Sequence, residues 1–160
     1  MIKFDINTTK NLLAFSAGID SSALFFLLLE QNIPFDIAIV DYNIRAQSKE
    51  ELAYAKNLAS KYQKKCFIKS ININNSSNFE KTARDIRYKF FDKIVSENSY
   101  ETLITAHQLN DKLEWFLMQF TKGAGLVELI GLDTYSSRNK YQIYRPLLDI
   151  SKDSLKNYLD

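Results

Sequence analysis

The sequence predicts an α/β fold with a doubly wound, mostly parallel five-stranded sheet and helices on both faces. Short apolar runs of strand type alternate with longer segments whose apolar residues recur at helical spacing. Polar or charged residues follow directly after several of the apolar runs. Strands that alternate with helices imply a parallel sheet covered on both sides. A chain of 160 residues, 46% hydrophobic and 25% charged, suits one folded domain.

The first unit is a strand, a short loop and a helix. Leu12–Phe15 is a strand-type run, Ser16–Ser22 is small and polar, and Ala23–Leu29 is apolar throughout. Such a joint leaves backbone N–H groups unpaired at the positive end of the helix dipole, so it predicts an anion site. Gly18 allows close approach or a positive φ, and the serines add hydroxyl donors. Many joints of this kind only turn the chain, so the spacing alone leaves both interpretations open.

Asp20 is the unusual residue of this loop, because a carboxylate repels a phosphate unless a cation lies between them. It therefore predicts either a helix N-cap or a magnesium ligand. The loop lacks the Gly-Lys-Ser/Thr of a Walker A motif and, with one glycine, the dinucleotide fingerprint. If the position of Ala17 requires a positive φ, the alanine costs about 1 kcal/mol or more.

The remaining elements are expected in alternation. Further strands are predicted over Phe35–Val40, Cys66–Ile71, Leu103–Ala106 and Tyr141–Tyr144. Helices are predicted after a Ser48/Glu51 capping box, over Phe79–Asn98, over Asn110–Thr121 up to a glycine cap in Lys122–Gly125, and after Ser151. Helical spacing assigns the buried stripes to Leu52, Ala55, Ala59 and Tyr62, to Ala83, Ile86, Phe90 and Ile94, and to Leu113, Phe116, Leu117 and Phe120.

Polar residues follow the predicted strand ends, and ligands of parallel α/β sheets bind beyond those ends. The segments in question are Ser16–Ser22, Asp41–Asn43, His107–Glu114 and Arg145. Their convergence at one edge of the sheet is the strongest functional prediction from the pattern alone.

Two charged pairs accompany these segments. Arg84 and Arg87, three residues apart on a helix, can grip a phosphate, although a solvated basic face is the favoured interpretation of that pair alone. Asp111 and Glu114 are also three apart, in a first helical turn where acidic residues favour the dipole as well.

Composition excludes several classes of protein. The longest apolar run, Ala23–Leu29, is too short to span a bilayer, and the first residues lack a signal-type apolar core. We therefore expect a cytoplasmic protein without membrane contact. Cys66 is the only cysteine, which excludes an intramolecular disulfide and argues against a cysteine zinc cluster. The net charge of +2 neither requires nor excludes nucleic acid.

The loop SAGIDSS, Ser16–Ser22, resembles the Ser-Gly-Gly-X-Asp-Ser pyrophosphate loop of the N-type ATP pyrophosphatases, or PP-loop superfamily, with Ala17 at the first glycine. Further segments resemble the tRNA(Ile)-lysidine synthases within that superfamily. The matches are Thr105, Ala106, His107, Asp111 and Glu114 in TAHQLNDKLEW, then Glu80 with Ala83–Tyr88, Lys122–Gly125, and Arg145–Leu148. Asn110 departs from the pattern by removing one of the paired carboxylates, and Tyr42 and Asn43 alter the edge where adenine is expected.

This resemblance implies an adenine nucleotide alpha hydrolase-like fold and a ligase that forms a carbon–nitrogen bond. Such an enzyme uses ATP and magnesium to adenylate C2 of the wobble cytidine, and replaces the C2 oxygen with L-lysine. The implied partners are L-lysine, tRNA(Ile) with a CAU anticodon, and a second copy of the chain in a homodimer. Residues 1–160 would form the PP-loop catalytic domain, and a tRNA-binding C-terminal region is expected to be absent from this chain.

The resemblance also assigns roles to single residues. ATP would be bound by Ser16, Ala17, Gly18, Ile19, Asp20, Ser21, Ser22 and Asp41, and magnesium by Asp20. The catalytic residues would be Asp20, Arg84, His107, Asp111 and Glu114. The substrates would be bound by Arg84, Arg87, Asp111, Glu114 and Arg145. A strand-end histidine that pairs with the backbone is the alternative role for His107.

Three other functions stay open at this point. A tRNA thiolase of the same superfamily would commonly need active-site cysteines, and Cys66 begins a strand away from the expected site. An amidotransferase-type or NAD synthetase-type ligase shares the loop but lacks the Ala83–Tyr88 segment. A nucleotide-binding domain without catalysis is favoured by Ala17 and Asn110.

Overall fold

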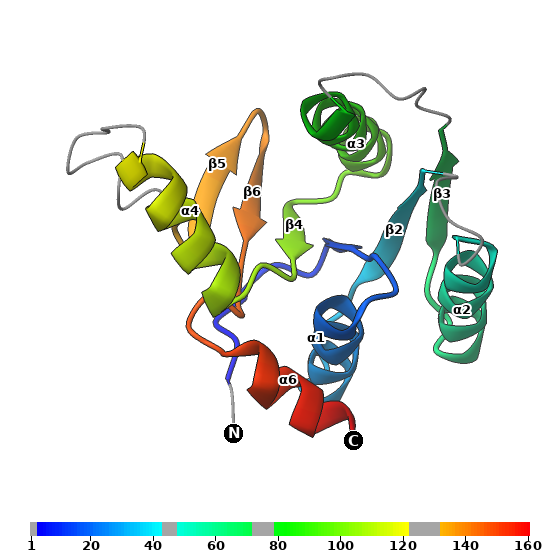
Figure 1. Ribbon diagram of the computed structural model, residues 1–160. Helices are drawn as coiled ribbons and strands as arrows, with labels where there is room; N and C mark the ends of the chain where they lie inside the picture. Colours follow the sequence, from blue (N-terminus) through cyan, green and yellow to red (C-terminus); the bar gives the residue numbers. More distant parts are fainter. Residues whose placement is uncertain (1–2, 43–47, 72–78, 122–131) are drawn as a thin grey trace.

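The computed structural model describes residues 3–42, 48–71, 79–121 and 132–160. The predicted glycine cap in 122–125 lies outside these residues. One sheet contains β1 (Asn11–Ala14), β2 (Asp36–Asp41), β3 (Cys66–Ser70), β4 (Thr102–Thr105), β5 (Tyr135–Arg138) and β6 (Tyr141–Tyr144). The helices are α1 (Ile19–Glu30), α2 (Ser48–Lys61), α3 (Phe79–Asn98), α4 (Leu109–Thr121) and α6 (Lys152–Leu159). Figure 1 shows their arrangement.

The sheet has the order β3-β2-β1-β4-β6-β5, and every neighbouring pair except β5–β6 is parallel. The predicted doubly wound fold is confirmed, with six strands in place of the predicted five. The additional strand, Tyr135–Arg138, is an antiparallel edge strand joined to β6 by Asn139 and Lys140. Its sequence, YSSR, has no apolar alternation, because an edge strand pairs mainly through its backbone.

Successive strand residues face opposite sides of the sheet and build two cores. Leu13, Ile37 and Ile104 pack with buried residues of α1, α2 and α6. Leu12, Ala38 and Leu103 pack with buried residues of α3. The nearly continuous apolar character of β1, β2 and β4 therefore follows from burial on both faces, and the prediction of helices on both faces is confirmed (Figure 1).

The predicted buried stripe of α3 needs one correction. Ala83 and Ile94 are buried as expected, but Phe91 is buried and Phe90 is only half-buried. Ile86 is half-buried too. The inward face is thus rotated toward Phe91, which packs beside Leu12 and Leu103 in the second core.

The predicted orientation of α4 is wrong. Its apolar stripe, Leu113, Phe116, Leu117 and Phe120, is 43–65% exposed, and none of the described residues of this helix is buried. Helical spacing identifies an apolar face but does not say what covers it. In this structure the stripe lies on the surface, and the rings of Phe116 and Phe120 stack on each other with centroids 6.3 Å apart.

The carboxyl ends of four parallel strands meet at one edge. Ala14 at the end of β1 pairs in register with Ala38 of β2 and Thr105 of β4, and Ile104 pairs with Tyr144 of β6. The segments that follow these strands therefore leave the sheet side by side, as predicted. Within the described parts of the chain, no helix combines the length and the apolar character needed to cross a membrane.

Candidate active site

The loop after β1 is organised by its own hydroxyl groups. The Ser16 N–H donates to Ser21 Oγ at 3.2 Å, and the two serine hydroxyls lie 3.0 Å apart. Ser21 Oγ also donates to the Gly18 carbonyl at 3.2 Å, while the Gly18 N–H donates to Ser16 Oγ at 3.4 Å. Ser21 and Ser22 are buried and Ser16 is exposed. The loop is therefore closed on itself, with the Ser16 hydroxyl at its open side.

The left-handed residue of the loop is Ala17, with φ 60°, and not Gly18. Gly18 is the N-cap of α1 in extended conformation, φ −79° and ψ 171°, so the positive φ considered for it is not present. A non-glycine residue in the left-handed region costs about 1–2 kcal/mol. Position 17 therefore does have the positive φ for which alanine is unfavourable. This chain carries that conformational cost at the centre of its predicted anion-binding loop.

Asp20 lies in the first turn of α1 and is not its cap, so the N-cap interpretation of this residue is wrong. Its Oδ1 atom is buried and has no hydrogen-bond partner among the described residues. Burial raises the pKa of the Asp20 carboxyl, Lys152 opposes this rise, and Asp111 adds to it. A half-buried carboxylate with one oxygen that has no hydrogen-bond partner fits the role of a magnesium ligand. Magnesium is usually held by one or two carboxylates together with substrate phosphates.

A cavity of about 340 Å³ opens between this loop and the ends of β2 and β4. Ser16, Asp20 and Ser21 form one wall, and Arg87, Tyr88 and His107 form another. Tyr42 closes the β2 side, where burial raises the pKa of its phenol and Arg87 opposes the rise. The cavity thus combines hydroxyl donors, a helix N-terminus and a guanidinium, which suits a phosphorylated ligand. We call it the loop cavity.

His107 follows β4 and separates the loop cavity from its neighbour. Its Nδ1 lies 2.9 Å from Thr105 Oγ1. Burial, together with the positive charges of Arg145, Arg87 and Arg84, lowers the pKa of His107 to about 4, while Asp111 opposes the shift. The imidazole is therefore neutral at pH 7. A neutral imidazole can donate or accept a hydrogen bond with a nucleotide without adding a positive charge to the site. Among the described residues, the hydrogen-bond partner of the imidazole is the side-chain hydroxyl of Thr105 and not a backbone group.

A second cavity, of about 260 Å³, shares Arg87, Tyr88 and His107 with the loop cavity. Asp111 and Glu114 of α4 line one side of it, opposite Arg84 and Arg87 of α3. We call it the acidic cavity. Its walls carry both a pair of carboxylates and a pair of guanidinium groups, so it suits a ligand with a cationic part next to an anionic part.

The two carboxylates of the acidic cavity differ in their environment. Asp111 Oδ2 accepts a hydrogen bond from the Gln108 backbone N–H at 2.8 Å, which caps the start of α4. Glu114 is exposed and lies one turn further along the helix. Asp111 therefore has a structural role at the start of α4. Its other carboxylate oxygen remains available to the acidic cavity, which it lines.

Arg145 follows β6 and completes the acidic cavity. Its Nη1 donates to the Asp133 carbonyl and to Ser136 Oγ, both at 2.9 Å. Burial lowers the pKa of Arg145, and the nearby Arg84 lowers it further. Its predicted convergence with the His107–Glu114 segment at the strand ends agrees with the structure, and Arg84 lines the same cavity.

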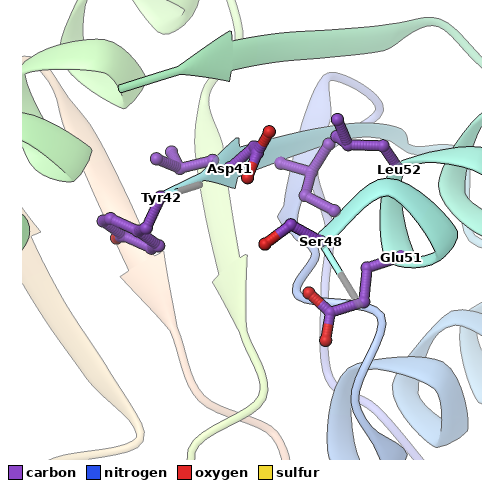
Figure 2. A pocket seen from close by; sticks show the side chains of 7 residues that line it. Asp41, Tyr42, Ser48, Glu51 and Leu52 are labelled. Atoms are coloured by element: carbon purple, nitrogen blue, oxygen red, sulfur yellow. The ribbon is translucent and has the colours of Figure 1, made fainter. Parts of the chain in front are cut away.

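Asp41 lies apart from the other predicted ATP ligands. It is buried at the end of β2, and Ser70 Oγ donates to its Oδ2 at 3.5 Å. Figure 2 shows Asp41 and Tyr42 at the end of β2 and Ser48 and Glu51 at the start of α2, and these residues line a pocket of about 200 Å³. Tyr42 and Glu51 line this pocket as well as the loop cavity, so Asp41 borders an extension of the site.

Two residues of the site were missed from the sequence. Tyr88 lines both cavities, and its membership of the Ala83–Tyr88 segment was the available signal. Trp115 lines the acidic cavity, and its spacing of four from Asp111 places both on one side of α4. The apolar spacing of α4 did not indicate Trp115, because the apolar stripe lies on the opposite face of the helix.

Residues 2–160 of the chain match the family model of the PP-loop domain. The chain belongs to the PP-loop family. This assignment confirms the predicted superfamily, and it implies that the domain binds ATP.

Curated relatives point to one branch of the PP-loop family. The chain is 53% identical over 150 residues to a tRNA(Ile)-lysidine synthase of Campylobacter jejuni strain RM1221, covering 94% of this chain and 46% of that protein. It is also 53% identical over 147 residues to the tRNA(Ile)-lysidine synthase of Helicobacter pylori strain 26695, covering 92% and 44%. The chain thus spans less than half the length of these curated relatives.

Solved structures support the PP-loop fold. The U34-tRNA thiolase NcsA of Methanococcus maripaludis superposes with a TM-score of 0.75 at 21% identity, over 95% of this chain and 55% of that one. A phosphoadenylyl-sulfate reductase of Candida auris superposes with a TM-score of 0.55 at 13% identity, over 93% and 71%. At these identities the likeness concerns the fold alone.

Proposed function

We propose that this PP-loop domain is the catalytic part of a tRNA(Ile)-lysidine synthase, which replaces the C2 oxygen of the wobble cytidine with L-lysine and releases AMP and pyrophosphate. One observation carries the proposal. The loop cavity and the acidic cavity share Arg87, Tyr88 and His107, so a nucleotide bound in one lies next to a cationic ligand bound in the other. The lysidine synthase relatives, more than 50% identical, support the same reaction.

The first step activates a poor electrophile. The C2 oxygen of cytidine attacks the α-phosphorus of ATP, the bond from phosphorus to the pyrophosphate oxygen breaks, and C2 becomes linked to AMP. In this proposal the Ser16 and Ser21 hydroxyls, which line the loop cavity, and the N–H groups at the start of α1 would hold the leaving pyrophosphate. Arg87, between both cavities, can offset the charge that develops on the transferred phosphate.

The second step forms the new carbon–nitrogen bond. The ε-amine of lysine attacks C2, the C2–oxygen bond breaks, and AMP leaves with that oxygen. The ammonium must first lose a proton, which costs roughly 4–5 kcal/mol at pH 7 for a pKa of ~10.4. Asp111 and Glu114 can accept this proton or hold the α-ammonium group. His107, with its pKa lowered to about 4, is too weak a base for that transfer.

Asp20 is the residue proposed to hold magnesium, since its buried Oδ1 has no partner in the described part of the chain. Bound magnesium would neutralise charge on the phosphate oxygens of ATP. The described residues contain no cluster of three or more metal-ligating side chains.

The thiolase alternative is weakened by the position of Cys66. This only cysteine of the chain pairs in register with Ile37 near the amino end of β2, far along the strand from the edge that carries the site. Burial also raises the pKa of the Cys66 thiol, which disfavours the reactive thiolate.

The proposal is tested by pyrophosphate release from the full-length protein with ATP. Release that needs both L-lysine and a tRNA(Ile) transcript with a CAU anticodon is the expected result. Release with tRNA and a sulfur donor, or with neither substrate, would contradict it. Two further expectations belong to the proposal, namely a homodimer, tested by sedimentation velocity, and a cytoplasmic location, tested by cell fractionation.

A further inference from the structure

A basic groove of about 370 Å³ runs from the acidic cavity toward the β5 edge of the sheet. It lies between α3 and the β5–β6 hairpin and carries Arg84, Lys89, Arg138, Arg145, Ser136 and Ser137. Four cationic side chains thus line the groove together with the carboxylate of Asp85, and one of them, Arg138, is paired with Asp92. Two serine hydroxyls between the cations add neutral hydrogen-bonding groups.

The floor of this groove is held in place before any ligand binds. Arg138 donates from Nε and Nη2 to the two carboxylate oxygens of Asp92, each at 3.0 Å. The guanidinium of Arg138 also lies over the Tyr88 ring, 4.5 Å from its centroid. Tyr141 donates to the same Asp92 carboxylate at 2.6 Å. These contacts fix the Arg138 side chain, so it can meet a ligand in the groove at little cost in side-chain entropy.

The groove continues directly into the site described above. Arg84, Tyr88 and Arg145 line both the groove and the acidic cavity. A chain-like ligand whose end or branch enters the acidic cavity would therefore leave it along the groove. Spaced cations with intervening hydroxyls in an open groove match a polyanion better than a single small anion.

We propose that this groove binds the sugar–phosphate backbone of the RNA strand that carries the modified nucleotide. The inference rests on the proposed function, since it takes tRNA as the substrate, and it adds the surface by which the domain itself holds the strand. Arg138 and Arg145 are the fixed contacts, and Lys89 and Ser137 are exposed contacts at the outer side. Backbone contacts of this kind position the RNA without reading its sequence.

The test uses Lys89→Glu in the full-length protein, with Lys61→Glu as the matched control. Both lysines are exposed and both changes alter the net charge equally, but Lys61 lies on α2, which packs against β2 and β3 at the opposite end of the sheet. Affinity for a tRNA(Ile) anticodon stem-loop is measured against salt concentration. Lys89→Glu should weaken binding several-fold and lower the log–log salt slope by about 1. Lys61→Glu should change neither quantity.

Activity separates this inference from the function on which it rests. Lys89→Glu should raise the KM for tRNA and leave the KM values for ATP and lysine unchanged. Stem-loop binding that is equal in Lys89→Glu and wild type would overturn the groove, even where lysine-dependent turnover supports the function. Binding that depends on Lys89 in a protein without lysine-dependent turnover would support the groove and overturn the function. If inorganic phosphate displaced the stem-loop completely from this groove, the groove would be a small-anion site. That result would overturn the proposal.

Discussion

The Asp111 carboxylate accepts a hydrogen bond from the Gln108 backbone N–H at 2.8 Å, and the Gln108 side chain in turn accepts one from the Asn110 N–H at 2.8 Å. These two bonds satisfy backbone N–H groups of Gln108 and Asn110 and so cap the start of α4. Asp111 therefore serves the helix with one oxygen and the acidic cavity with its other side. Glu114, exposed and one turn further, lines the same cavity. The two carboxylates should respond differently to substitution.

Glu114→Gln should raise the KM for lysine while the affinity for ATP and the stability of the fold stay unchanged. Asp111→Ala should weaken lysine use as well and lower the free energy of unfolding by about 1 kcal/mol, because a cap is lost. Asp111→Asn should preserve most of the cap and still weaken lysine use. Lysine kinetics, ATP titration and urea denaturation check these effects. Equal losses for lysine and ATP would assign both carboxylates a structural role.

Asp20→Asn should abolish the magnesium dependence of ATP binding. It should also raise the thermal midpoint of the ligand-free protein at pH 7. Burial raises the pKa of the folded Asp20 carboxyl above 3.8, so its contribution to stability is present below that pH and lost as the pH rises through the folded value. The neutral amide removes this loss. Isothermal titration with and without magnesium checks the first effect, and unchanged magnesium dependence would remove Asp20 from the metal site.

Ala17→Gly should stabilise the protein by about 0.5–1 kcal/mol, because glycine relieves the strain at φ 60° while the unfolded chain gains some entropy. Ala23→Gly, inside α1, is the control and should destabilise it by about 1 kcal/mol or more. Urea denaturation measures both changes. A loss of stability in Ala17→Gly would show that the loop strain is smaller than the angle implies.

Much of this architecture could be predicted because its signals are local. Strand-type runs predicted β1, β2, β3, β4 and β6 to within a residue or two, and polar residues at their ends predicted the site edge. The β5 strand could not be found, because an exposed edge strand needs no apolar alternation. Contacts between Asp111 and Gln108, or between Arg138 and Tyr88, depend on side-chain geometry that spacing does not encode.

His107 is the only histidine of the chain, so its imidazole gives one resolved NMR titration. The folded protein should titrate with a pKa of about 4, against about 6.5 when unfolded in urea. Because the folded value is the lower one, stability is full above pH 6.5 and falls by roughly 3 kcal/mol as the pH drops toward 4. His107→Gln should remove this part of the pH dependence. A folded-state pKa near 6.5 would mean that the imidazole is solvated.

The apolar stripe of α4 offers the last prediction, since Leu117 is 59% exposed while Leu103 in β4 is fully buried. Leu103→Ala should cost about 2–5 kcal/mol, through lost burial and a cavity between the sheet and α3. Leu117→Ala should cost within about 0.5 kcal/mol in the 160-residue chain, because the side chain contributes little buried area. Urea denaturation of both variants checks the contrast, and equal costs would contradict the exposed position of α4. A larger cost for Leu117→Ala in the full-length protein than in this chain would show that another segment covers the stripe there.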